Sequence, residues 1–174
     1  MQISRQRNQG NQGMTRRGFS MIELVTILAI IAILAMMAVP TFIDRNVRLQ
    51  VQEGLAMADL AVKGVQSFYV DPKNKNEFPA NNEEAGIPPK DKIVSNLVSE
   101  VNIEAGAVTV TFGNNVNGSI TGKHLTIRPI IVKDEPKVSM DWLCNTAAVP
   151  KNMTAVGENR TDVPGKWLPI KCRG

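Results

Sequence analysis

Residues 18–24 read Gly-Phe-Ser-Met-Ile-Glu-Leu, and they stand between a basic leader and a long apolar stretch. The leader holds four arginines and no acidic residue, and residues 24–39 hold nothing more polar than Thr26. An ordinary secretory signal has its small-residue cleavage site after the apolar core. Here the small residue, Gly18, comes before the core. Cleavage at this glycine would remove only the charged leader and leave the apolar segment on the mature chain, with Phe19 as its new N-terminus.

The apolar segment, residues 19–39, is long enough to span a membrane. As a helix it would extend about 30 Å, which matches the hydrocarbon thickness of a bilayer. Basic Arg17 precedes it, and Asp44, Arg45 and Arg48 follow it. A buried core helix is the alternative, but the length and the uniform apolarity favour a span. The basic leader then favours an orientation with the leader in the cytoplasm and the C-terminal portion outside.

The net charge of +4 is carried by the leader alone. Of the 20 Lys and Arg residues, four lie in residues 1–18, which leaves 16 basic residues against 16 acidic residues from Phe19 onward. The mature chain is therefore formally neutral, and its charge gives no reason to expect nucleic-acid binding. A length of 174 residues suits one modest domain and a membrane anchor.

The order of basic leader, glycine, phenylalanine, glutamate and apolar helix resembles the class III leader of type IV pilins and related pilin-like proteins. In that family a prepilin peptidase cuts after the glycine and methylates the new N-terminal residue. The resemblance implies that Gly18 ends the leader and that Phe19 is methylated. It also implies that Glu23 and Pro40 act in filament assembly. The leader is longer than many in the family, and Met14 offers a second possible start in place of Met1.

Glu23 needs an explanation, because a charge within a membrane span costs free energy. The cost reaches about 2.5–3.5 kcal/mol at the centre of a helix and is lower near its end. A partner cation would lower it further, and the resemblance supplies the amine of Phe19, in the same subunit or in a neighbour. This pairing is expected to set the axial register as a subunit enters the filament. The alternatives are a surface glutamate at the membrane interface and a plain signal anchor with a chance glutamate.

Past Pro40 the chain keeps its helical pattern but becomes amphipathic. Apolar residues recur every three or four positions, as on one face of a helix: Val47, Val51, Leu55, Ala58, Val62, Val65 and Phe68. The helix should end near Val70, because Asp71 precedes Pro72 and is biased out of the helical region. Pro40 should kink or locally loosen the helix.

The remainder reads as a loop followed by short strands. Residues 71–92 are rich in proline, and strand-like runs follow at about residues 98–103, 108–112, 124–132 and 138–144. Short connections favour an antiparallel meander over βαβ units. Pro129 interrupts the third run, which indicates an edge position or a bulge. Residues 145–174 read as irregular.

Cys144 and Cys172 are the two cysteines, and both lie beyond the membrane segment. In an exported, oxidising location such a pair favours a disulfide, worth about 3–4 kcal/mol for a loop of this length. Metal binding is a weaker interpretation, since two distant thiols and one histidine make no ligand spacing. Two free buried thiols are a further alternative.

The expected fold class is α+β. A long N-terminal helix, transmembrane in its first half and amphipathic in its second, packs on a four-stranded antiparallel sheet with a C-terminal disulfide loop, which resembles the type IVa pilin fold. The expected division is a leader at 1–18, a transmembrane and filament-core helix at 19–40 and a globular domain at 41–174. Within that domain we expect a helix at 41–70, a loop at 71–92, a sheet at about 98–144 and the disulfide loop at 144–172.

Other candidate chemistry is sparse, so neither a cofactor nor an enzymatic activity is expected. His124 is the only histidine and is interpreted as structural. Residues 118–123 superficially resemble a phosphate loop, but only three residues separate the glycines and His124 follows. This segment is predicted to be a turn. No pair of nucleophile and base is visible.

The resemblance implies a structural subunit of a type IV pilus, which supports adhesion, twitching motility or DNA uptake. The precursor would be a single-pass inner-membrane protein with a periplasmic C-terminus, and the assembled form a cell-surface pilus. Implied partners are other subunits, the prepilin peptidase, the assembly platform with its ATPase, and a secretin. Alternatives are a minor pilin, a pseudopilin of type II secretion, and a membrane-tethered DNA receptor that uses Lys171 and Arg173.

Overall fold

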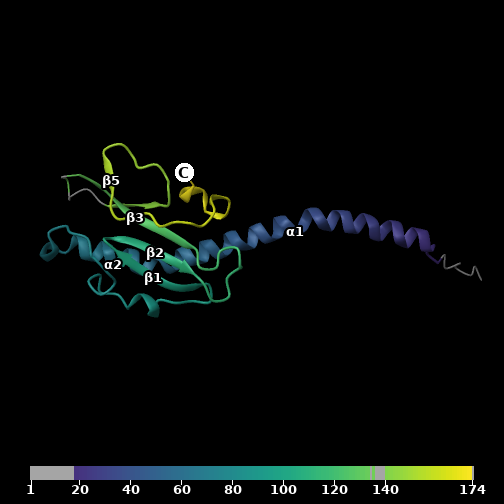
Figure 1. Ribbon diagram of the computed structural model, residues 1–174. Helices are drawn as coiled ribbons and strands as arrows, with labels where there is room; N and C mark the ends of the chain where they lie inside the picture. The colour runs from purple at the N-terminus through teal and green to yellow at the C-terminus, as the bar shows by residue number, and fades with distance from the viewer. Residues whose placement is uncertain (1–17, 134, 136–139, 174) are drawn as a thin grey trace, which may run out of the picture. The chain divides into compact units, whose positions relative to one another are not determined.

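The computed structural model describes residues 18–133, 135 and 140–173 (Figure 1). Contacts between residues group the chain into two units that meet at Pro40 and Thr41. Helix α1 runs over Met21–Met57 and α2 over Asp59–Val70. The predicted helix end at Val70 is therefore confirmed, with Asp71 in an extended conformation directly after it. Pro40 lies within α1 and does not end it, and the kink expected there stays a prediction.

The first unit exposes a continuous apolar helix. Every residue from 18 to 38 is exposed, including large side chains at almost every position. The helical stretch Met21–Val70 is long and apolar enough to cross a membrane. An apolar surface of this length requires an apolar surrounding, either lipid or other helices.

The second unit is built on an antiparallel sheet. Its main path runs β1-β2-β3-β4, with β1 at Val98–Glu104, β2 at Ala107–Phe112, β3 at His124–Val132 and β4 at Asp141–Cys144. The predicted four-stranded meander is confirmed. The first residues of the fourth predicted run, 138 and 139, lie outside the described residues. Ala105 and Gly106 turn β1 into β2, and both have positive φ, as two-residue hairpin turns require.

Pro129 occupies a place in β3 where a proline costs little. The ladder between β2 and β3 extends only to Val108 and Ile127, so Pro129 stands beyond its end. On the other edge of β3, Pro129 is the partner of Trp142 in β4. The predicted edge position is wrong, because β3 pairs with β2 and β5 on one edge and with β4 on the other. The missing N–H removes no bond of the β2 ladder, because that ladder ends before Pro129.

A fifth strand corrects the expectation that residues 145–174 are irregular throughout. Strand β5, Met153–Ala155, pairs antiparallel with the end of β3, at Ile130–Val132. Ile130 also pairs with Asp141 in β4, so β5 and β4 lie on opposite edges of β3. Strand β5 has only three residues, which are too few to show the alternation of apolar and polar residues by which a strand is recognised in a sequence. The remaining short elements are the 3-10 helices η1 (Pro72–Asn74), η2 (Lys90–Lys92), η3 (Gly165–Trp167) and η4 (Ile170–Cys172).

The amphipathic part of α1 and α2 packs on the sheet, as Figure 1 shows for the second unit. Four of the predicted face residues are fully buried: Val47, Val51, Ala58 and Val65. Leu55, Val62 and Phe68 are only half-buried, because the centre of the face is shifted toward Gly54, Ala61 and Gly64. Small residues let the helix approach the sheet closely, and a pattern of large apolar side chains does not reveal them.

Replacing Gly54 by alanine is expected to lower the free energy of unfolding by about 1–3 kcal/mol, as overpacking in cores does. A Cβ at Gly54 would overlap the ring of Phe112 in β2, which is itself fully buried. Urea denaturation of the full chain in detergent measures the change. Gly54→Ala/Phe112→Leu should be more stable than the two single changes predict, because leucine lacks the overlapping ring. If Gly54→Ala stabilised the chain, helix propensity would dominate and the close approach would be refuted.

Candidate functional site

The residues of the predicted cleavage site lie before the first helical turn. Gly18 and Phe19 precede α1, which begins at Met21, and both are exposed. Among residues 18–133, 135 and 140–173, no heavy atom lies within 4 Å of the position that a Cβ on Gly18 would take. The peptide bond between these two residues therefore lies in non-helical, uncovered backbone, as a protease substrate requires.

Glu23 lies in the first turn of α1. A carboxylate in this position interacts favourably with the positive end of the helix dipole. The backbone carbonyl of Glu23 accepts a hydrogen bond of 2.9 Å from the Thr26 hydroxyl. Among the described residues, the Glu23 carboxylate forms no ion pair. Its position is compatible with pairing to an amine outside the described chain, and that pairing stays a prediction.

Cys144 and Cys172 form the disulfide that we predicted. Their Cα atoms are 4.7 Å apart, and both residues are buried. The bond joins the end of β4 to η4, and the alternatives of a metal site and of two free thiols are excluded for this pair. Elsewhere in the described part of the chain, no three His, Cys, Asp or Glu side chains come together as a metal site would require.

A polar contact that the sequence does not predict joins the C-terminal segment to α1. The indole Nε1 of Trp167 donates a 2.8 Å hydrogen bond to Oδ1 of Asp44. Nζ of Lys166 lies 3.4 Å from the same oxygen and 4.4 Å from the centre of the Trp167 ring. The hydrogen bond from Trp167 is the largest cause that lowers the pKa of Asp44, and Lys166 and Arg48 lower it further. More than a hundred positions separate these partners, so no local pattern connects them.

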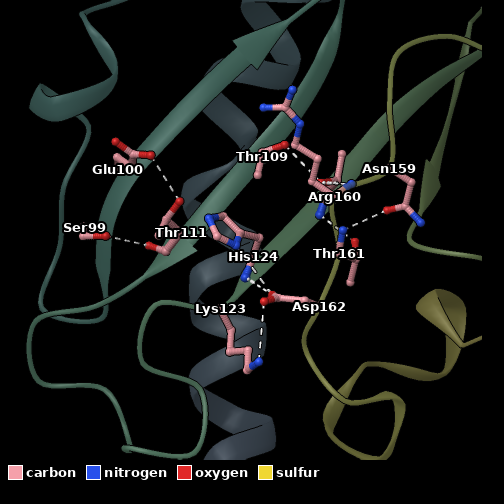
Figure 2. A network of polar contacts seen from close by, with 11 residues as sticks. Ser99, Glu100, Thr109, Thr111, Lys123, His124, Asn159, Arg160, Thr161 and Asp162 are labelled. Atoms are coloured by element: carbon pink, nitrogen blue, oxygen red, sulfur yellow. Dashed lines mark hydrogen bonds and ion pairs between the residues drawn. The ribbon is translucent and has the colours of Figure 1, made fainter.

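The chain around residues 157–162 covers the face of the sheet opposite the helices (Figure 2). The hydroxyls of Thr109 in β2 and Thr126 in β3 share a buried hydrogen bond of 3.0 Å. Thr126 also binds the covering segment, because its N–H donates to Thr161 Oγ1 and its Oγ1 accepts from the N–H of Arg160. Gly157 packs against Ala107, where a Cβ would overlap. The centre of this face, at Thr109 and Thr126, is therefore buried as well.

Charged groups at the rim of this face hold the covering segment in place. Arg160 forms a double contact with Glu104 of β1, at 2.6 and 2.9 Å, and a third with Glu158 at 3.1 Å. The hydrogen bond with Glu158 is the largest cause that raises the pKa of Arg160. His124 contacts Asp162 through its backbone N–H and, at 3.6 Å, through Nδ1. The histidine therefore has a structural environment, as predicted.

The glycine-rich segment 118–123 is a turn, as predicted. The N–H of Ile120 donates to Asn117, and the N–H of Gly122 donates to Phe112. Ile120 is fully buried. These amides are used within the protein, so they do not form a cradle for a phosphate.

An exposed apolar helix, an amphipathic continuation packed on an antiparallel meander, and a disulfide that closes the C-terminal segment together define the pilin-like class. The model of a family described as pilin (bacterial filament) matches residues 47–173. The chain belongs to this family.

Curated relatives extend the match into the N-terminal helix. The chain is 34% identical over 164 residues to the type IV major pilin protein PilE1 of Neisseria gonorrhoeae, which covers 90% of this chain and 87% of that protein. It is 32% identical over 167 residues to a fimbrial protein of Neisseria meningitidis, and the match covers 90% of this chain and 94% of that protein. A fimbrial protein of Eikenella corrodens, EcpC, is 29% identical over 160 residues, with 90% of each chain covered.

Proposed function

We propose that this chain is a structural subunit of a type IV pilus. The observation that carries the proposal is the exposed apolar helix of residues 18–38, which continues into the domain that the pilin family model matches. The relatives named as type IV major pilin and fimbrial proteins support it. The role is structural rather than enzymatic, in keeping with a family of bacterial filaments.

Maturation begins with cleavage between Gly18 and Phe19, followed by methylation of the Phe19 amine by the prepilin peptidase. The exposed, non-helical backbone at these residues supports cleavage at this bond. A peptidase must approach the backbone closely, and glycine has no Cβ to obstruct it. The mature chain would then begin two residues before α1 and keep its whole apolar helix.

Gly18→Val is expected to leave most of the chain with its leader attached, because the branched side chain obstructs the peptidase at the scissile bond. Mass spectrometry of the N-terminus measures the fraction that begins at Phe19. The matched control is Gly13→Val, the same change within the leader, which should be processed normally. A Gly18→Val chain that begins at Phe19 would show that the glycine is not required for cleavage.

Before assembly the processed chain is held in the inner membrane by residues 19–39, with its C-terminus in the periplasm. On assembly these helices exchange lipid for contact with one another and form the core of a surface filament. Glu23 neutralises the amine of a neighbouring Phe19, and Pro40 adapts the helix at the end of the apolar segment. The peptidase, the assembly platform with its ATPase and the secretin act as partners. Adhesion, twitching motility and DNA uptake are activities of the filament as a whole.

Electron microscopy of sheared surface appendages, with mass spectrometry of their main component, tests the proposal. A filament whose main component is this chain, beginning at methylated Phe19, is the expected result. Recovery of the chain only as a trace component would instead indicate a minor pilin or a pseudopilin. An extracellular product without residues 19–39 would overturn the proposal.

A further inference from the structure

A cavity of about 420 Å³ lies in the C-terminal part of the second unit, and its lining carries positive charge without an acidic residue. The lining residues are Asn145, Thr146, Gly165, Lys166 and Arg173. The Thr146 hydroxyl accepts a 3.1 Å hydrogen bond from the Asn145 amide, so its own proton is left to donate to another acceptor. A phosphodiester only accepts hydrogen bonds, so cations and hydroxyl donors are the groups that bind it. Here these groups are Arg173, the Thr146 hydroxyl and Lys166, which also contacts Asp44.

Arg173 is held in place by backbone carbonyls. Its Nε donates to the carbonyl of Leu168 at 2.9 Å, and one terminal nitrogen approaches the carbonyl of Lys166 at 3.4 Å. Among the described residues, Arg173 has no carboxylate within ion-pair distance. The adjacent Cys172 is fixed by its disulfide and by a 3.0 Å hydrogen bond from Asn145 to its carbonyl. The guanidinium is therefore preorganised for an anion that the described chain does not supply.

The cavity lining is linked to the part of α1 that directly follows the apolar segment in the chain. Lys166, which lines it, contacts Asp44, and Asp44 is four residues beyond Pro40, a rise of about 6 Å in a helix. Arg45 and Arg48 follow Asp44 on α1 and are exposed, and neither forms an ion pair within the described part of the chain. Arg45 and Arg48 thus follow the apolar segment within eight positions of Pro40 in the chain, and basic residues directly after a membrane span favour anionic headgroups.

We propose that this cavity binds the phosphodiester of an anionic phospholipid headgroup while the subunit is anchored in the membrane. The inference rests on the proposed function, which places residues 19–39 in the bilayer. Binding would hold the second unit against the membrane surface until assembly withdraws the helix from the lipid. DNA carries the same phosphodiester chemistry but is less suited, because Trp167 beside the cavity is buried and offers no surface on which a base can stack.

Fluorescence of Trp167 in nanodiscs tests this site. Trp142 is the other tryptophan of the chain, so Trp142→Phe makes Trp167 the sole reporter. The full chain carrying this change is placed in phosphatidylcholine nanodiscs with an increasing fraction of phosphatidylglycerol. We expect a saturable change in Trp167 emission, because Lys166 stacks on its ring and would move toward the headgroup. Arg173→Gln should raise, by about fivefold, the phosphatidylglycerol fraction at which half of the emission change is reached. This is the effect expected for loss of one basic residue near a membrane surface.

Control variants separate charge from structure. Arg173→Lys keeps the charge but loses the fixed guanidinium geometry, and should recover only part of the response. Lys151→Gln removes the same charge from an exposed turn before β5 and should respond as the parent chain does. Arg48→Gln alters no hydrogen bond of the described chain and should weaken the response to a similar extent as Arg173→Gln.

Three results would overturn the inference. One is an emission that does not depend on phosphatidylglycerol. Another is an equal response to inorganic phosphate added to phosphatidylcholine discs, which would assign the site to free phosphate. The third is a response to duplex DNA without a response to phosphatidylglycerol. Because the apolar helix alone should keep the protein in the disc, each of these results would leave the proposed function intact, whereas failure to enter the disc would refute the function itself.

Discussion

Glu23→Ala is expected to give a chain that is processed and membrane-inserted but yields about 10²–10³-fold less filament. In the proposed core the methylated amine of Phe19 would lose its carboxylate partner. Removing one partner of a buried ion pair costs about 3–5 kcal/mol, because the remaining charge stays buried without compensation, and each 1.4 kcal/mol is a factor of ten. The amount of sheared filament, normalised to processed subunit in the membrane, measures the effect.

The control variants for Glu23 keep either the size or the charge. Glu23→Gln retains the shape but not the charge, and should fail almost as completely as alanine. Glu23→Asp keeps the charge on a shorter side chain and should assemble in part. Glu53→Ala makes the same chemical change at an exposed position farther along α1 and should assemble normally. If Glu23→Gln assembled as the parent does, hydrogen bonding rather than charge would explain the requirement for this residue.

Local signals in the sequence predict the main elements of this fold. The helix ends at Val70 because Pro72 biases the preceding residue, and the structure has the same end. The third strand is predicted at its observed bounds, His124–Val132, because its apolar run is bordered by turn residues. The two cysteines are interpreted correctly because the apolar segment implies export, and export implies an oxidising location.

Features that depend on contacts between distant segments are not predicted. Gly54 belongs to the buried helix face because the ring of Phe112 in β2 occupies the space that a side chain at position 54 would need. The pairing of Trp167 with Asp44, and the cover that Arg160 and Thr161 place on the sheet, join segments with no shared pattern. At the candidate site the residues were identified by resemblance, whereas the cavity beside Lys166 becomes visible only when the C-terminal segment is folded.

Removing the disulfide is expected to lower the free energy of unfolding by about 3–4 kcal/mol, as estimated for a closed loop of this length. The chain with Cys144→Ala and Cys172→Ala is compared by urea denaturation with the parent chain, under oxidising conditions and after reduction. The reduced parent and the double variant should coincide. If the double variant retained the midpoint of the oxidised parent, the bond would contribute nothing to stability.

Without the disulfide, the C-terminal segment should unfold at a lower urea concentration than the rest of the second unit. Between Asn145 and Cys172 few large apolar side chains are buried, chiefly Val163, Trp167 and Leu168, so this segment depends strongly on its covalent link to β4. Without the link, Trp167 should leave Asp44 and become exposed at a lower urea concentration than that at which the sheet unfolds. Emission of Trp167, recorded in chains with Trp142→Phe, should then change before the circular dichroism of the sheet, whereas in the disulfide-bonded chain the two transitions should coincide. Coincident transitions in the variant would show that hydrogen bonds such as the one to Asp44 hold the C-terminal segment without the disulfide.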